Sequence, residues 1–196
     1  METNKENYTD DELVVLFRRG DKTAFEQLVY RYKNSLYQYI LSLVKDESVA
    51  GDLFQEVFIS FFKHVGSYKT QGKFKSWLFL TARNKVINYW RDTRAELSLD
   101  QTDEEGNAFL QEVLPDDSPL PLDSLTGQET LEQIRQAADL LPPRQREIME
   151  LRQYLSFQEI ADLLKRPLGT VLADCHRAVK KMQQLLQAQK VAEENL

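Results

Sequence analysis

Apolar residues recur along much of the chain at spacings of three and four, the pattern of helices that bury one face. Three long stripes cover residues 25–44, 53–65 and 74–93, and a short one covers residues 13–17. No segment keeps the strict alternation of a half-buried strand. The pattern therefore predicts four helices and no sheet in residues 1–97.

Hydroxyl side chains at several positions are suited to cap the N-termini of helices. The expected caps are Thr9 with Glu12, Ser48, and Ser156 with Glu159. The first and the last fit the capping box, in which the glutamate accepts a hydrogen bond from the backbone of the capping residue. Pro143 and Pro167 are expected to open two later helices, because proline suits the first helical position.

Helical periodicity resumes after residue 130 and continues to about residue 182. Residues 156–164 form one short apolar stripe. The next helix keeps one face apolar with Val171, Cys175, Ala178 and Met182. Lys165 and Arg166 separate the two helices. Two short helices joined by a tight turn, the second richer in basic residues, indicate a helix-turn-helix.

Between these two parts, residues 98–130 have no helical pattern. They contain nine acidic residues, no lysine or arginine, and three prolines. A stretch of this composition cannot bury a core of its own. We therefore expect an all-α protein with two helical domains, an N-terminal helical bundle (1–97) and a C-terminal helix-turn-helix domain (131–196), joined by an acidic flexible linker.

The composition narrows the class of protein further. Apolar residues make up 42% of the chain and charged residues 29%, as in folded globular proteins. No run approaches the roughly 18 consecutive apolar residues of a membrane span, and the polar start lacks the regions of a signal peptide. We expect a cytoplasmic protein without membrane insertion. Cys175 and the two histidines lack metal-ligand spacing, so no disulfide, metal or cofactor is expected.

Positive charge is concentrated in one segment although the net charge is −6. Residues 63–94 contain eight lysines and arginines against one acidic residue, and the segment is rich in aromatic side chains. Cations that follow a phosphate backbone, together with rings that stack on unpaired bases, predict contact with single-stranded DNA. The loop of residues 66–73 is a candidate to hold a flipped base.

A simpler alternative for this segment is that half of its aromatic residues belong to the core and its lysines to a solvated face. If the rings contact DNA, loss of Phe74 or Trp77 should impair strand opening. If Trp77 is instead a core residue, its loss should unfold the domain.

The second helix of the helix-turn-helix carries a separate candidate surface. Thr170, Asp174, Arg177 and Lys181 follow one another at spacings of 4, 3 and 4. These spacings predict one shared face, expected opposite the apolar stripe, that enters a major groove. Packing or protein contact is the alternative role for such a helix. Enzyme chemistry has little support, because Cys175 and His176 point about 100° apart on a helix.

Three runs of sequence resemble the conserved regions of extracytoplasmic-function (ECF) sigma factors of the sigma-70 family. They are AGDLFQEVFISFFKHVGSY, FKSWLFLTARNKVINYWRDTR and LPPRQREIMELRQYLSFQEIADLLKRPLGTVLADCHRAVKKM. The likeness covers roughly residues 25–186 apart from the linker. It implies a non-enzymatic subunit that binds core RNA polymerase and directs promoter recognition, strand opening and transcription initiation.

The resemblance also implies which residues contact each partner. Contacts with the largest polymerase subunit fall to Asp52, Leu53, Gln55, Glu56 and Phe58. Capture and melting of the minus-ten element fall to Lys69, Lys73, Phe74, Lys75, Trp77, Arg83, Asn84, Lys85, Asn88 and Arg91. Contacts with the minus-thirty-five element fall to Arg166, Thr170, Asp174, Arg177, Lys180 and Lys181. The second domain would also rest on the second-largest subunit, and an anti-sigma factor is an additional candidate partner.

The sequence departs from the family pattern in the second helix of the helix-turn-helix. Leu172-Ala173-Asp174 stands where the family usually has Lys-Ser-Arg, and Val179 replaces a common arginine. The Asp174 carboxylate would repel phosphate unless it pairs with Arg177 or accepts a hydrogen bond from a cytosine amino group.

Two other functions remain open from the sequence. A helix-turn-helix regulator that binds duplex operator DNA without polymerase would leave the basic, aromatic segment unexplained. An enzyme acting on nucleic acid is disfavoured, because no carboxylate cluster falls on a rigid element.

Overall fold

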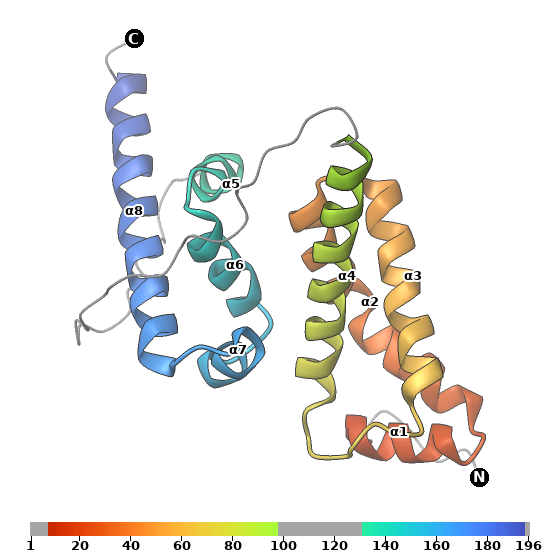
Figure 1. Cartoon of the computed structure of the whole chain (residues 1–196). Coiled ribbons are helices and arrows are strands. Elements are labelled where there is room, and N and C mark those ends of the chain that lie inside the picture. The colour runs from red at the N-terminus through yellow and green to blue at the C-terminus, as the bar shows by residue number, and fades with distance from the viewer. Residues whose placement is uncertain (1–7, 98–130, 195–196) are drawn as a thin grey trace. The chain divides into compact units, whose positions relative to one another are not determined.

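The computed structural model describes residues 8–97 and 131–194, which belong to two compact helical units (Figure 1). The first unit contains α1 (Asp10–Arg18), α2 (Lys22–Val44), α3 (Glu47–His64) and α4 (Phe74–Leu97). The second contains α5 (Leu131–Asp139), α6 (Pro143–Arg152), α7 (Phe157–Leu164) and α8 (Leu168–Glu194). No strand occurs among the described residues, as expected. The predicted acidic linker, 98–130, lies outside them.

The first domain is built on three long helices, with α1 lying across one end of them (Figure 1). α2 packs on α1, α3 and α4, and α3 packs on α4. Each helix buries residues at the three- and four-residue spacing that the sequence shows, such as Leu28, Tyr32 and Leu36 in α2. Hydrophobic burial of these stripes against one another forms the core.

One ring, that of Phe61 in α3, contacts aromatic rings from the three other helices of this domain. Its centroid lies 5.9 Å from that of Phe17 in α1 and 6.1 Å from that of Phe25 in α2. The rings of Phe74 and Trp77 in α4 lie 5.0 and 5.8 Å away. Phe61 is fully buried. The cluster joins all four helices at the end of the bundle where the loop of residues 66–73 begins.

Most of the expected helix ends are confirmed. Capping boxes form at Thr9 with Glu12 and at Ser156 with Glu159. Pro143 is the first residue of α6. The carbonyl of Pro167 accepts the first helical hydrogen bonds of α8, so this proline lies one position before the helix.

The expected cap at Ser48 is wrong. The Asp46 side chain accepts from the backbone N–H of Val49 at 2.9 Å, and α3 begins at Glu47. Ser48 therefore lies within the first turn. Both residue types are good N-caps, and the register of the apolar stripe alone does not distinguish positions two residues apart.

The second domain is arranged around α8, which packs against α5, α6 and α7. Leu141 joins Met182 and Leu186 in one apolar cluster, while Val171 and Cys175 are buried nearer the start of α8. The turn between α7 and α8 passes through Lys165, whose φ of 54° is left-handed. This compact turn gives the expected helix-turn-helix.

We predict that Phe74→Ala lowers the free energy of unfolding of the first domain by about 3–5 kcal/mol. The substitution would leave a cavity beside Phe61, because Phe74 is only 1% exposed. Urea denaturation followed by circular dichroism measures the change. Asn84→Ala, at an exposed position of the same helix, should stay within about 0.5 kcal/mol of the unmodified protein. Equal stability of the two variants would contradict the core role of Phe74.

Candidate nucleic-acid interface

The exposed face of α3 carries three of the five residues expected to contact polymerase. Asp52, Gln55 and Glu56 are exposed. Leu53 and Phe58 are each only 6% exposed and belong to the core, so their side chains do not offer the contact surface that was expected. The reason is the spacing, since Leu53, Val57 and Phe58 occupy the stripe that faces the other helices.

Two apolar residues extend this face of α3. Ile59 is 51% exposed and Phe62 is 62% exposed. Together with Asp52 and Gln55 they follow spacings of 3, 4 and 3, which place all four on one side of the helix. Phe62 was expected in the buried stripe, and Ile59 was not among the predicted contact residues. The width of the apolar stripe could have indicated that some of its residues are exposed, because the stripe is wider than the face that one helix of a small bundle can bury.

The exposed face of α4 presents amides and cations. Asn84, Asn88 and Arg91 are exposed and follow one another at spacings of 4 and 3, while Arg83 is half-buried. Lys85 is half-buried as well, and its Nζ lies 2.8 Å from Glu56 Oε2 on α3. This ion pair places the polar face of α3 directly beside α4.

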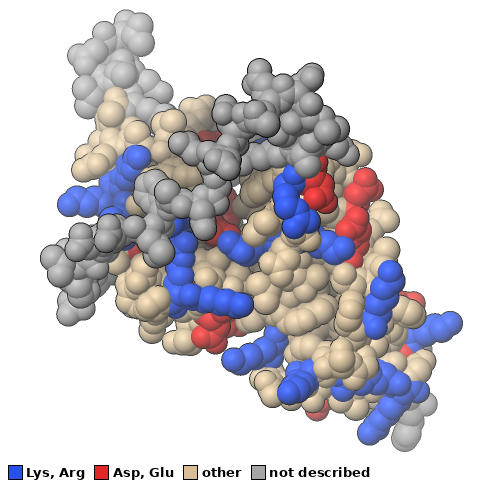
Figure 2. All heavy atoms as spheres, in the orientation of Figure 1, with Lys and Arg blue, Asp and Glu red and all other residues tan. Residues whose placement is uncertain are grey.

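The loop between α3 and α4 supplies further positive charge. Lys69 and Lys73 are exposed, and Lys75 in the first turn of α4 is half-buried. Figure 2 shows lysine and arginine side chains over the lower part of the visible face of the first domain, where acidic side chains are few. Of the eight basic residues of 63–94, the side chains of Lys63, Lys69, Lys73 and Arg91 are exposed.

Phe74 and Trp77, the aromatic residues expected to stack on DNA bases, are less exposed than the lysines of the loop. Phe74, expected as a base-stacking residue, is buried between the rings of Tyr32, Phe61 and Tyr68. That expectation is corrected, because the first turn of α4 closes the end of the bundle and directs Phe74 inward. Trp77 is half-buried, and its ring stacks on that of Phe74 with centroids 6.3 Å apart.

In the second domain, Asp174 lies within the apolar stripe of α8 and not opposite it. It is 9% exposed and falls three residues after Val171 and four before Ala178, both fully buried. The expected common face is therefore wrong for Asp174. The other expected residues remain at least partly accessible: Arg166, Thr170 and Arg177 are half-buried, and Lys180 and Lys181 are exposed.

Two arginines compensate the buried carboxylate. Arg177 Nη2 donates to Asp174 Oδ1 at 2.6 Å, and Arg166 Nη1 lies 3.7 Å from Asp174 Oδ2. A carboxylate buried in an apolar stripe needs cationic partners, because burial of an unpaired charge costs roughly several kcal/mol. The sequence left two roles open for Asp174, pairing with Arg177 or accepting a hydrogen bond from a cytosine. The structure shows the pairing with Arg177.

Metal binding and nucleophilic catalysis find little support among the described residues. They contain no group of three or more histidine, cysteine, aspartate or glutamate side chains suited to hold a metal. Burial raises the pKa of the Cys175 thiol, which makes it a weaker nucleophile. Within residues 8–97 and 131–194, none of the helices is long and apolar enough to span a membrane.

Comparison with known families and proteins gives matches to both domains. Residues 28–96 match the family described as Sigma-70 region 2, and residues 131–182 match Sigma-70, region 4. The RNA polymerase sigma-H factor of Pseudomonas aeruginosa is 31% identical over 182 residues, which are 91% of this chain and 94% of that protein. The ECF RNA polymerase sigma factor SigW of Bacillus subtilis is 30% identical over 86% of this chain and 92% of its own.

Solved structures share the fold. The sigma factor RpoE from Bartonella quintana, in complex with the anti-sigma factor NepR, aligns with a TM-score of 0.63 and 22% identity over 83% of this chain and 96% of its own. CnrH, in complex with the cytosolic domain of CnrY, aligns with a TM-score of 0.65 and 22% identity over 92% of this chain and 99% of its own. With both regions matched in order, the chain belongs to the sigma-70 family and is an RNA polymerase sigma factor of the ECF type.

Proposed function

We propose that this sigma factor docks on core RNA polymerase through the exposed face of α3 and engages the minus-ten element through the 66–73 loop and α4. The observation that carries the proposal is the ion pair between Lys85 and Glu56, which sets the two faces edge to edge on one domain. A single rigid domain can then touch polymerase and DNA at once. The chain itself catalyses no reaction, and bond formation belongs to the polymerase.

The face of α3 has the make-up of a specific protein interface. Ile59 and Phe62 give an exposed apolar centre, and Asp52, Gln55 and Glu56 give polar groups around it. Apolar anchors with a polar rim supply most of the affinity and the orientation in protein–protein contacts. We assign this face to the largest polymerase subunit.

The loop and α4 suit a separated DNA strand. Lys69, Lys73 and Lys75 supply cations for phosphates, and Asn84 and Asn88 offer amides that can donate to and accept from base edges. The half-buried Trp77 has a ring that is partly accessible for stacking. Phe74 is buried beneath Trp77 and does not form part of this surface.

The second domain is proposed to bind the minus-thirty-five element through α8 and to rest on the second-largest polymerase subunit. Lys180 and Lys181 are exposed there, whereas Arg166 and Arg177 are held by Asp174. Their charges are therefore partly neutralised before DNA arrives. We infer that the contribution of phosphate contacts to binding is smaller in this domain than its count of basic residues implies.

An anti-sigma factor is included among the proposed partners. One solved structure with this fold, RpoE, is bound to the anti-sigma factor NepR, and another, CnrH, is bound to the cytosolic domain of CnrY. A subunit that selects promoters works where the chromosome lies, so we place the protein in the cytoplasm. A regulator that acts without polymerase is the alternative function, and it predicts a different outcome of the binding experiment below.

We predict that the purified chain binds core RNA polymerase and supports run-off transcription from a matched promoter. Asp52→Lys should weaken core binding about tenfold or more, since it reverses a charge in the polar rim of the α3 face. Titration of fluorescently labelled protein with core polymerase measures the affinity.

Glu26→Lys is the matched control, because it makes the same change of charge at an exposed position of α2. It should bind core like the unmodified protein. Tight binding of duplex operator DNA together with no measurable binding of core would favour the polymerase-independent regulator and reject the proposal.

For the DNA surface, we predict that Lys69→Ala and Lys73→Ala each weaken promoter binding by the holoenzyme. Each should flatten the plot of log affinity against log salt by about 0.7 to 0.9, the change expected when one phosphate is no longer neutralised. Lys33→Ala, at an exposed position of α2, should leave the slope unchanged. A slope that stays the same in the loop variants removes these lysines from the interface.

In the second domain, Asp174→Asn should release Arg166 and Arg177 for contact with phosphates. We expect tighter binding of promoter duplex and a steeper salt dependence, by up to about 0.9 for each arginine. Asp162→Asn on α7 removes the same charge from an exposed position and should change neither. If Asp174→Asn instead abolishes a preference for one cytosine, the carboxylate contacts the base and the ion pair is not its main role.

A further inference from the structure

The loop of residues 66–73 is tied to α1, a helix that neither the family matches nor the proposed contacts include. The match to Sigma-70 region 2 begins at residue 28, after the end of α1. Side chains from both ends of α1 nevertheless hold the loop through hydrogen bonds. The loop is too short and too polar to bury a core of its own, so hydrogen bonds to a neighbouring helix help to hold it in place.

Asp11, in the first turn of α1, holds the middle of the loop. Its Oδ2 accepts from the backbone N–H of Gly72 at 2.7 Å, and its Oδ1 accepts from the Tyr68 hydroxyl at 3.2 Å. Gly72 has a φ of 67°, a conformation that side-chain-bearing residues rarely adopt. One carboxylate therefore fixes two points of the loop, one of them at its tightest bend.

Arg18, at the other end of α1, holds the start of the loop. Its Nε donates to the carbonyl of Val65 at 2.6 Å, and its Nη2 donates to the carbonyl of Tyr68. These carbonyls follow the last turn of α3, where a cation is also favoured by the helix dipole. The start of the loop is thereby held against α1.

Tyr68 links the two ties. Its hydroxyl is bonded to Asp11 and to the backbone of Lys73, and its ring lies 6.1 Å from that of Trp77. Burial, and then the nearby Asp11 carboxylate, raise the pKa of Tyr68 far above its usual value. The protonated hydroxyl is the form that donates to Asp11.

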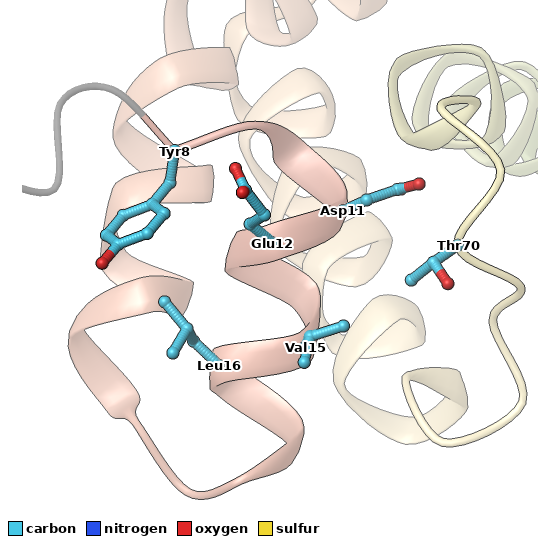
Figure 3. A pocket seen from close by; sticks show the side chains of 6 residues that line it. All are labelled: Tyr8, Asp11, Glu12, Val15, Leu16 and Thr70. Carbon is cyan, nitrogen blue, oxygen red and sulfur yellow. The ribbon is translucent and has the colours of Figure 1, made fainter.

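Figure 3 shows the space between α1 and the loop, with Asp11 directed toward the segment that carries Thr70. The space is a shallow pocket of about 410 Å³ whose lining includes Val15 and Leu16 of α1. The hydrogen bonds from Asp11 and Arg18 join the loop to α1 beside this pocket.

We propose that Asp11 and Arg18 of α1 are positioning residues for minus-ten recognition, which set the base preference of the 66–73 loop by fixing its conformation. The inference rests on the proposed function, since it assumes that this loop engages the minus-ten element and, as the sequence analysis predicts, holds one of its bases. A loop held in one conformation can reject a wrong base, because the wrong base leaves polar groups unpaired. A loop released from α1 can adapt to several bases.

Asp10 provides a matched control for this proposal. Like its neighbour Asp11, it accepts a hydrogen bond from a tyrosine hydroxyl, that of Tyr32, and it also pairs with Arg31. Both of these partners lie on α2 and not in the loop. Asp10→Asn therefore weakens the attachment of α1 to the bundle without removing a hydrogen bond between Asp10 and residues 66–73.

The experiment uses holoenzyme reconstituted from core RNA polymerase and the full chain. The probe is a promoter library randomised across the minus-ten element, and the transcribed templates are sequenced. The quantity measured is the ratio of the most to the least favoured base at each position. Asp11→Asn and Tyr68→Phe should lower this ratio about fivefold at one or two positions, the effect of losing one hydrogen bond. Asp10→Asn should leave every ratio within about twofold of that of the unmodified protein.

Tyr68→Phe keeps the ring packed against Phe74 and removes only the hydroxyl, so it decides the question if Asp11→Asn does not fold. Unchanged ratios in Tyr68→Phe and Asp11→Asn would overturn the proposal. An equal loss in Asp10→Asn would also overturn it, because α1 would then act only through the stability of the domain. A holoenzyme of the unmodified chain with no minus-ten preference would reject the proposed function itself.

Replacement of Arg18 gives an independent check. Arg18→Met should reduce the base ratios at the same positions as Asp11→Asn. Arg19→Met removes the same charge from the neighbouring exposed position and controls for a general loss of attraction to DNA. Equal base ratios in the two arginine variants would exclude Arg18 from positioning the loop.

Discussion

The first domain depends on the burial of the Phe61 ring among rings from α1, α2 and α4. Rings of this size bury on the order of 150–250 Å² each, so a cluster of them dominates the energy of a small core. Because Phe61 lies on α3 and two of its partners lie on α4, the cluster also fixes how these helices face each other. In that arrangement Glu56 of α3 and Lys85 of α4 form an ion pair. The core therefore determines which side chains reach the surface that we assign to polymerase and DNA.

The two domains differ in how their charged side chains are placed. In the first, the lysines of the 66–73 loop are exposed, where solvation keeps them charged at little cost. In the second, the Asp174 carboxylate occupies a position in the apolar stripe of α8 and depends on Arg166 and Arg177 for compensation. Such an arrangement is tolerated only with good geometry, and it neutralises part of the positive charge of α8 and of the turn before it. Val179, another departure from the family pattern, is fully buried and contributes to the same core.

The 66–73 loop is joined by hydrogen bonds to α1, a helix that precedes the residues matched by the Sigma-70 region 2 family. The backbone of Gly72 and the side chain of Asp11 are 61 residues apart in sequence, and Arg18 lies 50 residues from Tyr68. These contacts join a loop that has few apolar groups to a helix distant in the sequence. Functional loops are commonly placed by a scaffold in this manner, and their own sequence then says little about their shape.

The sequence by itself determined the all-helical class, the two domains and most helix ends, because helical period and capping depend on residues a few positions apart. It also indicated the exposed Asp52, Gln55 and loop lysines, whose polarity excludes them from a core. Only the tertiary structure decided that Phe74 is buried, that Phe62 is exposed and that Asp174 lies among arginines. The reason is physical: a broad apolar stripe does not reveal which of its edges the neighbouring helices cover, and a charged residue does not reveal whether a distant partner will offset the cost of its burial.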